Sequence, residues 1–331
     1  MSILPVILAA CALAAAAQEQ QFAELKDFRL QSGQTLATVK IGYRTVGTLN
    51  ASRSNAVLFP TWFGGTSQNL LMFAAADQLV DPAKHFVVFV DALGNGVSTS
   101  PSNTPQLPVF SIRDMVESQY RLAKEVLGIG KLHAVMGISM GGMQSFEWAV
   151  AHPGYMTRIV PIIGSPKQSM PDLLLWQAQL SAIEAAVANG VDPRTAMPAV
   201  QAMHNYAIRT PEYAAAEQPA ADFPKLKASF EKSAKTGMHP LDWASQLRAM
   251  MGQDIGHGES LQSAAARVAA KMLIVVALQD HMVNPKTALE FARLGGHQTL
   301  ELSSNCGHMA PNCESARVSP IVRNFLERDG I

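Results

Sequence analysis

The sequence contains few cysteines and no excess of charge of either sign. Only three cysteines occur in 331 residues, which excludes a small scaffold held together by disulfides. No C-x-x-C pair or His/Cys cluster with zinc-like spacing is present, so we expect no metal site, and we expect no cofactor. Lysine plus arginine and aspartate plus glutamate each total 26, and a net charge of zero argues against a nucleic-acid-binding protein.

Charged residues make up only 16% of the chain, whereas hydrophobic residues make up 48%. This composition excludes an intrinsically disordered chain and is sufficient for a large buried core. The length of 331 residues fits either two average domains or one large α/β domain with an insertion.

The segment 1–17 differs from the rest of the chain. It has no charged residue and ends on small residues at Ala15, Ala16 and Ala17. It is shorter than the ~20 apolar residues of a membrane-spanning helix, so we expect no stable membrane insertion of the mature protein. A short apolar run that closes on small residues is typical of a secretory signal, and the alternative is a buried N-terminal helix. We therefore predict export, with Cys11 as a candidate site for a lipid anchor.

From about Phe22 onward, strand-like and helical segments alternate. The predicted strands are 35–43, 56–59, 85–90, 132–137, 158–163, 272–278 and 298–302, and the predicted helices are 111–127, 142–152, 286–294 and 315–327. Short apolar strands that alternate with helices indicate a mainly parallel sheet with helices on both faces. Residues 165–270 contain Ala-rich helical segments instead, which predicts a helical cap inserted into an α/β core of 22–164 and 271–331.

The motif Gly137-Ile138-Ser139-Met140-Gly141 is the first candidate for chemistry. It has the form G-x-S-x-G, with a predicted strand directly before it and a predicted helix directly after it. This context is typical of a nucleophile elbow, a strained turn in which small neighbours expose the serine. The alternative interpretation is an ordinary glycine-rich turn.

A serine hydroxyl needs a base that takes its proton, and the elbow fold orders its triad as Ser, then Asp or Glu, then His. Asp280 directly follows the next-to-last predicted strand, whereas the preceding strand is followed by Gly164-Ser165-Pro166, which contains no acid. His308 follows the last strand and is the candidate base. Of its rivals, His281 adjoins the acid and His297 precedes the strand, so both are in less suitable positions. We interpret the other histidines as surface or packed residues.

Acyl transfer also requires N–H donors that are aimed at the developing oxyanion. The elbow supplies the backbone N–H of Met140. The second donor is expected in the loop after strand 56–59, from Thr61 or Trp62, and we favour Trp62. The alternative for this loop is a plain turn with a packed tryptophan.

Several segments resemble the homoserine O-acetyltransferases, an α/β-hydrolase family. The similarity is most specific over 111–153, in DMVESQYRLAKEVLGIGKLHAVMG and in GISMGGMQSFEWAVAHP, and it extends over most of 35–325 through DALGNGVSTSPSN and RAMMGQDIGHG. The resemblance implies an α/β-hydrolase core, a helical cap and a homodimer formed through the cap. It also implies the roles of nucleophile for Ser139, acid for Asp280 and base for His308.

Two positions depart from this family pattern. Met309 stands where the family has an aspartate after the catalytic histidine, and His257 replaces the arginine of the segment D-x-G-R-G. Arg209 either matches the cap arginine that meets the substrate carboxylate in the family or is a surface cation at a helix end. Loss of a charged partner leaves an amino-acid substrate unpaired, at a cost of ~2–5 kcal/mol, which argues against homoserine.

The leading hypothesis is therefore an esterase-like serine hydrolase that acts on a small-molecule ester or related acyl bond through an acyl-enzyme. An exported enzyme would lack acetyl-CoA, so water is the expected acceptor. The alternative is an O-acyltransferase that uses acyl-CoA, and a third hypothesis is an inactive α/β-hydrolase module used for binding.

Cys306 and Cys313 lie on either side of His308 in the sequence. In an oxidising compartment they could form a disulfide that rigidifies the loop of the base. The alternative is two packed free thiols, because the spacing alone does not fix the distance between the two Cα atoms.

Overall fold

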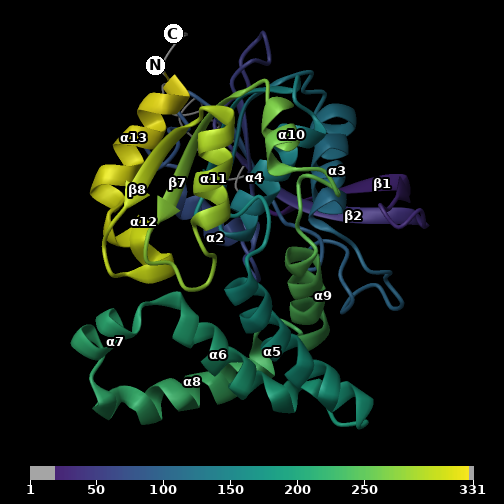
Figure 1. Cartoon of the computed structure of the whole chain (residues 1–331). Helices are drawn as coiled ribbons and strands as arrows, with labels where there is room; N and C mark the ends of the chain where they lie inside the picture. The colour runs from purple at the N-terminus through teal and green to yellow at the C-terminus, as the bar shows by residue number, and fades with distance from the viewer. Residues whose placement is uncertain (1–18, 328–331) are drawn as a thin grey trace, which may run out of the picture.

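A computed structural model describes residues 19–327, so the predicted signal segment 1–17 and Cys11 lie outside the described residues. One sheet of eight strands, in the order β1-β2-β4-β3-β5-β6-β7-β8, forms the centre of the molecule (Figure 1). The strands are β1 (Gln21–Arg29), β2 (Thr35–Val46), β3 (Ala56–Pro60), β4 (Phe86–Val90), β5 (Leu132–Ile138), β6 (Met156–Ile162), β7 (Lys271–Ala277) and β8 (Gln298–Leu302).

The sheet is mainly parallel, as the sequence predicts. The β1–β2 and β2–β4 pairs are antiparallel, and all pairs from β4 through β3 to β8 are parallel. Because successive side chains point to opposite faces, Leu58 of β3 packs into one buried cluster, whereas Val57 and Phe59 pack into another. Both faces are therefore covered, which explains why these strands consist almost wholly of apolar residues.

The helices of the core are divided between these two faces. The cluster on the face of Leu58 includes residues from α3 (Ile112–Arg121), α4 (Met140–Ala151) and α11 (Lys286–Gly295). The cluster on the opposite face includes residues from α2 (Ser67–Leu70) and α13 (Ser315–Glu327). The short helix α12 (Ala310–Cys313) precedes α13.

Six helices lie between β6 and β7, in the region where the sequence predicts an insertion. They are α5 (Met170–Ala188), α6 (Met197–Ile208), α7 (Pro211–Glu217), α8 (Phe223–Thr236), α9 (Pro240–Met251) and α10 (Leu261–Ala266). The helices α5 to α9 each have a proline in their first turn, where the missing N–H leaves no hydrogen bond unmade.

These six helices are not all in one place. Figure 1 shows α5, α6, α7 and α8 gathered below the core, whereas α10 packs against α11 at the level of the sheet. The last helix of the inserted region thus lies with the core, and α9 runs between the two parts. Within residues 19–327, no helix combines the length and apolar character that crossing a membrane requires.

Candidate active site

The turn between β5 and α4 presents Ser139. The backbone of Ser139 has φ 57° and ψ −120°, a left-handed conformation that is strained for a residue with a side chain. A Cβ added at Gly137 would lie 2.2 Å from the carbonyl oxygen of Gly141, and one added at Gly141 would lie 2.6 Å from that of Pro60. The two glycines of G-x-S-x-G therefore permit a turn that larger residues would block.

Three of the residues singled out in the sequence lie within hydrogen-bonding distance of one another. The Nε2 atom of His308 is 2.9 Å from Oγ of Ser139, and its Nδ1 atom is 2.6 Å from Oδ2 of Asp280. All three side chains are buried. The rival histidines lie elsewhere: His281 is exposed, and the ring of His297 packs against Phe291.

The partners of His308 determine where its proton resides. An ionised carboxylate only accepts hydrogen bonds, so Nδ1 carries the proton toward Asp280 and Nε2 is free to accept from the hydroxyl of Ser139. The other oxygen of Asp280 accepts the backbone N–H groups of Met282 at 2.8 Å and Val283 at 3.0 Å. Both carboxylate oxygens thus have partners, which fixes the orientation of the acid.

The loop after β3 offers a free backbone donor beside the serine. The N–H of Thr61 donates to the carbonyl oxygen of Val90 at 3.0 Å, so it is already used. Across residues 19–327, the N–H of Trp62 donates to no acceptor. The N–H of Met140, as the first amide of α4, has no acceptor within its helix. Met140 and Trp62, rather than Thr61, therefore have backbone N–H groups available to an oxyanion.

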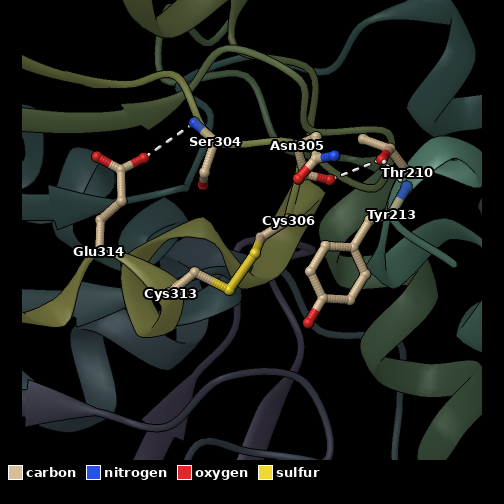
Figure 2. Close-up of a disulfide and its surroundings, with 7 residues drawn as sticks. All are labelled: Thr210, Tyr213, Ser304, Asn305, Cys306, Cys313 and Glu314. Carbon is tan, nitrogen blue, oxygen red and sulfur yellow. Dashed lines mark hydrogen bonds between the residues drawn. A yellow bond between two sulfur atoms is a disulfide. The ribbon is translucent and has the colours of Figure 1, made fainter. Parts of the chain in front are cut away.

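A disulfide fastens the loop that carries His308. Cys306 and Cys313 are bonded, with their Cα atoms 6.6 Å apart, so of the two alternatives left open by the sequence the structure contains the bridge. Figure 2 shows this bond joining the loop to α12. The carboxylate of Glu314 also accepts the backbone N–H of Ser304 at 3.0 Å, which ties the start of the loop to the residue after α12.

The cap holds the same loop from the other side. The hydroxyl of Thr210, at the start of α7, donates to the carbonyl oxygen of Asn305 at 2.6 Å (Figure 2). Gly307 adopts φ 64°, and a Cβ placed there would lie only 3.0 Å from the backbone of Arg209 and Thr210. The absence of a side chain at Gly307 therefore allows the cap to approach the residue next to His308.

A cavity of about 300 Å³ opens onto Ser139 and His308. Its remaining lining is aromatic, aliphatic or neutral polar: Trp62, Phe63, Met72, Phe73, Ile138, Ile163, His204, Ile208, Met282, Met309 and Asn312. No lysine, arginine, aspartate or glutamate occurs among these lining residues. The cavity is at the small end of the range for ligand pockets and suits a small ligand without charge.

The cap residue His204 contributes an uncharged ring to this cavity. Its ring packs against those of Phe63 and Trp243, with centroid distances of 5.5 Å and 5.1 Å. Burial lowers the pKa of His204 to about 4, and the neighbouring His308 contributes to the same shift. The ring is therefore neutral near pH 7. This position could not be found from the sequence, because a histidine in a cap helix reaches the cavity only through tertiary packing.

The residues that were compared with the homoserine O-acetyltransferase pattern occupy different places. Met309 lines the cavity. His257 lies outside it, with Nε2 2.9 Å from a carboxylate oxygen of Glu147, so its replacement of arginine does not alter the charge of the cavity lining. The guanidinium of Arg209 lies over the ring of Tyr213, 4.8 Å from its centroid, and Arg209 is not among the lining residues.

A comparison with known proteins shows the family of this chain. The model of the alpha/beta hydrolase fold matches residues 56–311, which is most of the chain. The chain belongs to the α/β-hydrolase fold family. In residues 19–327 of this α/β hydrolase, no group of three or more His, Cys, Asp or Glu side chains is placed to hold a metal ion.

Relatives of this α/β hydrolase include esterases and acetyltransferases. It is 36% identical over 171 residues to a probable esterase of Corynebacterium glutamicum, and this match covers 49% of each chain, so it spans about half the length of that relative. It is 27% identical to a homoserine O-acetyltransferase of Geotalea daltonii, over 95% of this chain and 98% of the other. Among solved structures, an acetylester hydrolase from Corynebacterium glutamicum matches with a TM-score of 0.86 and 25% identity, over 95% of this chain and 98% of that one.

Proposed function

We propose that this α/β hydrolase is a serine esterase that hydrolyses small esters without charged groups through an acyl-enzyme on Ser139. The observation that carries the proposal is the cavity at Ser139 and His308, whose lining contains no acidic side chain, lysine or arginine. An ammonium or carboxylate group placed there would lose its hydration without gaining a charged partner, which costs several kcal/mol. A neutral ester loses much less.

The proposed first step uses the hydrogen-bonded side chains of Ser139, His308 and Asp280. The hydroxyl of Ser139 attacks the ester carbonyl while Nε2 of His308 takes its proton, and Asp280 stabilises the resulting imidazolium. The carbonyl electron pair becomes an oxyanion, which the N–H groups of Met140 and Trp62 stabilise. The C–O bond to the alcohol then breaks, and His308 returns the proton to the departing alcohol.

In the second step water replaces the alcohol. His308 takes a proton from the water, the hydroxide attacks the acyl carbonyl, and the bond to Ser139 breaks as its oxygen regains a proton. The products are the free acid and the regenerated serine. A predicted export signal in residues 1–17 would favour water as the acceptor, because an exported enzyme meets little acetyl-CoA.

An O-acyltransferase is the second candidate function. It is supported by the similarity to a homoserine O-acetyltransferase over nearly the full length of both chains. Such an enzyme would share the first step and would differ in the acceptor. It would need to hold the charged acceptor in the cavity, and Arg209, the cap cation considered for this role, lies over Tyr213 instead.

The two functions are distinguished by giving the protein each substrate separately. One reaction contains p-nitrophenyl acetate, and the other contains acetyl-CoA with L-homoserine. We expect rapid release of p-nitrophenol and acetate, with little or no O-acetylhomoserine. Efficient formation of O-acetylhomoserine with slow ester hydrolysis would contradict the esterase proposal and establish the acyltransferase. Absence of both products, together with no labelling of Ser139 by an active-site phosphonate, would support an inactive binding module.

A further inference from the structure

A chain of buried polar side chains connects the nucleophile helix α4 to the loop after β3. Its central member is Gln144, which is fully buried on α4. The Nε2 atom of Gln144 donates to the carbonyl oxygen of Thr61 at 3.0 Å and to that of Met140 at 3.1 Å. A single amide group therefore contacts both segments that supply backbone donors to the proposed oxyanion hole.

The orientation of this amide is determined by its neighbours. The indole N–H of Trp148, which can only donate, lies 2.8 Å from Oε1 of Gln119. The NH₂ group of Gln119 must then face Gln144, and it donates to Oε1 of Gln144 at 2.5 Å. This leaves the NH₂ group of Gln144 directed at two carbonyl oxygens, which can only accept. The indole N–H of Trp148 and the two carbonyl oxygens require the same orientation of the side-chain amide of Gln144, so this amide cannot be reversed.

The carbonyl of Thr61 belongs to the peptide group whose N–H is that of Trp62. In a trans peptide the C=O and N–H bonds point in opposite directions, and the described chain has no cis peptide bond. When Gln144 holds the carbonyl of Thr61 against α4, the N–H of Trp62 is directed away from the helix. Hydrogen bonding to the carbonyl also polarises the peptide group, which makes its N–H a stronger donor.

We propose that Gln144 is a positioning residue for the oxyanion hole, acting through the peptide group between Thr61 and Trp62. The proposal rests on the proposed esterase function, because an oxyanion forms only if Ser139 attacks an acyl group. Gln119 and Trp148 act one step further away, since they fix the orientation of Gln144. This series of hydrogen-bonded side chains thus extends from the interior of α4 to the N–H of Trp62, the proposed donor to the oxyanion.

The principal test is Gln144→Leu, which keeps a similar volume and removes the donor. An interaction that acts mainly on the oxyanion should lower kcat and leave KM nearly unchanged. Loss of a direct oxyanion donor lowers kcat by about 10²–10³-fold, so loss of its support should lower kcat by about 10- to 100-fold, with KM within about threefold. The inhibition constant of a trifluoromethyl ketone, which forms a tetrahedral adduct with the serine, should rise by a similar factor.

Gln253→Leu is the matched control. Gln253 is also buried, and its Nε2 donates to the carbonyl oxygen of Met143 at 3.3 Å, so it contacts α4 without touching the loop of Thr61. We expect its kcat and inhibition constant to stay within about threefold of the wild-type values. Thermal unfolding of both variants shows whether they lose comparable stability. If Gln144→Leu does not fold, Gln119→Leu replaces it. This variant keeps Gln144 but removes the hydrogen bond to its Oε1 atom that fixes the orientation of the amide.

The outcomes separate this proposal from the proposed function. A selective loss of kcat and of ketone affinity in Gln144→Leu, or a smaller loss of the same kind in Gln119→Leu, supports the positioning role. An active wild-type protein with a Gln144→Leu variant that keeps kcat and ketone affinity within twofold overturns the positioning role alone. A change in KM equal to the change in kcat/KM, with kcat intact, also overturns it. A wild-type protein that neither hydrolyses the ester nor binds the ketone overturns both proposals.

Discussion

The two walls of the cavity are built in different ways. On the core side, Ser139 and His308 are held by hydrogen bonds, a strained turn and a disulfide. On the cap side, His204 and Ile208 are held by aromatic and apolar packing, and the surrounding helices still expose large apolar side chains such as Leu174. The core wall therefore fixes where atoms react, whereas the cap wall determines what can enter. Substitutions on the two sides should therefore differ in their effects on kcat and on stability.

Removal of the nucleophile should have the largest effect. We expect Ser139→Ala to lower kcat for p-nitrophenyl acetate by at least about 10⁴-fold, because no other group at the site can form the acyl-enzyme. Ser118→Ala is the matched control, since Ser118 is buried on α3 and donates only to the carbonyl oxygen of Met115. Steady-state kinetics of both variants provide the measurement. Near-normal kcat in Ser139→Ala would exclude Ser139 as the nucleophile.

Asp280→Asn should have the next largest effect, lowering kcat by about 10³- to 10⁴-fold. The amide cannot stabilise a charged imidazolium as a carboxylate does, and it favours the wrong tautomer of His308. The control is Asp242→Asn, because Asp242 on α9 is also buried but accepts its hydrogen bonds from Ser102, in the loop between β4 and α3. We expect kcat of the control within about threefold of wild type. Equal losses in the two variants would show a general effect on folding instead.

Loss of the disulfide should change stability more than chemistry. For a loop this short, the chain-entropy model gives about 2.5 kcal/mol of unfolding free energy. The variant with both Cys306→Ser and Cys313→Ser should lose about this amount in urea unfolding, with kcat reduced less than about tenfold because Thr210 still holds the loop. Wild-type protein treated with dithiothreitol should behave alike. Two free thiols in denatured, unreduced protein would disprove the bridge.

The smallest contribution of a single residue should be that of each of two histidines, which lower stability in mild acid. Burial lowers the pKa of His204 in the cap and of His85 in the core to about 4. The unfolded chain binds protons at these rings near pH 6.5, and the folded chain does so only near pH 4, so stability falls as pH drops between these values. Between pH 7 and pH 5 each histidine should cost roughly 2 kcal/mol.

The cap wall can be tested with His204→Gln, and His85→Gln provides a reference in the core, because His85 does not line the cavity. Each substitution removes one titrating ring and should reduce the pH-dependent loss in urea unfolding by about half. If only His85→Gln changes the pH dependence, the ring in the cap is not shielded from water, and the cap wall is more open than its packing indicates. If neither variant changes it, other groups account for the acid sensitivity.

The proximity of Ser139, Asp280 and His308 could be predicted because it depends on local sequence and on chain order. The turn at Ser139 needs small neighbours that are adjacent in the sequence, and Asp280 and His308 lie in the loops that follow the last two strands. The helix after Ser139 begins at Met140, two residues before the predicted start at Gly142, because glycines within the first turn concealed its beginning.

Other features could not be predicted, for physical reasons that differ. The strand β1 was missed because Asp27 adopts φ 50°, which moves the buried positions from Ala23 and Leu25 to Phe28 and breaks the alternation. The place of His204 in the cavity lining was missed because His204 reaches the cavity only when the cap packs on the core. The network of Gln144 connects residues that are far apart in the sequence, and its polar members carry no local signature.

The central claim is that Ser139 becomes acylated and that water removes the acyl group. The most direct test mixes the protein with p-nitrophenyl acetate, quenches the reaction in acid within milliseconds to seconds, and examines the peptide containing Ser139 by mass spectrometry. We expect an acetyl group on Ser139 that appears with the first turnover, disappears when the ester is exhausted, and is absent in Ser139→Ala. Hydrolysis without acetylation of this serine, or an acetyl group on another residue that turns over at the catalytic rate, would contradict the account.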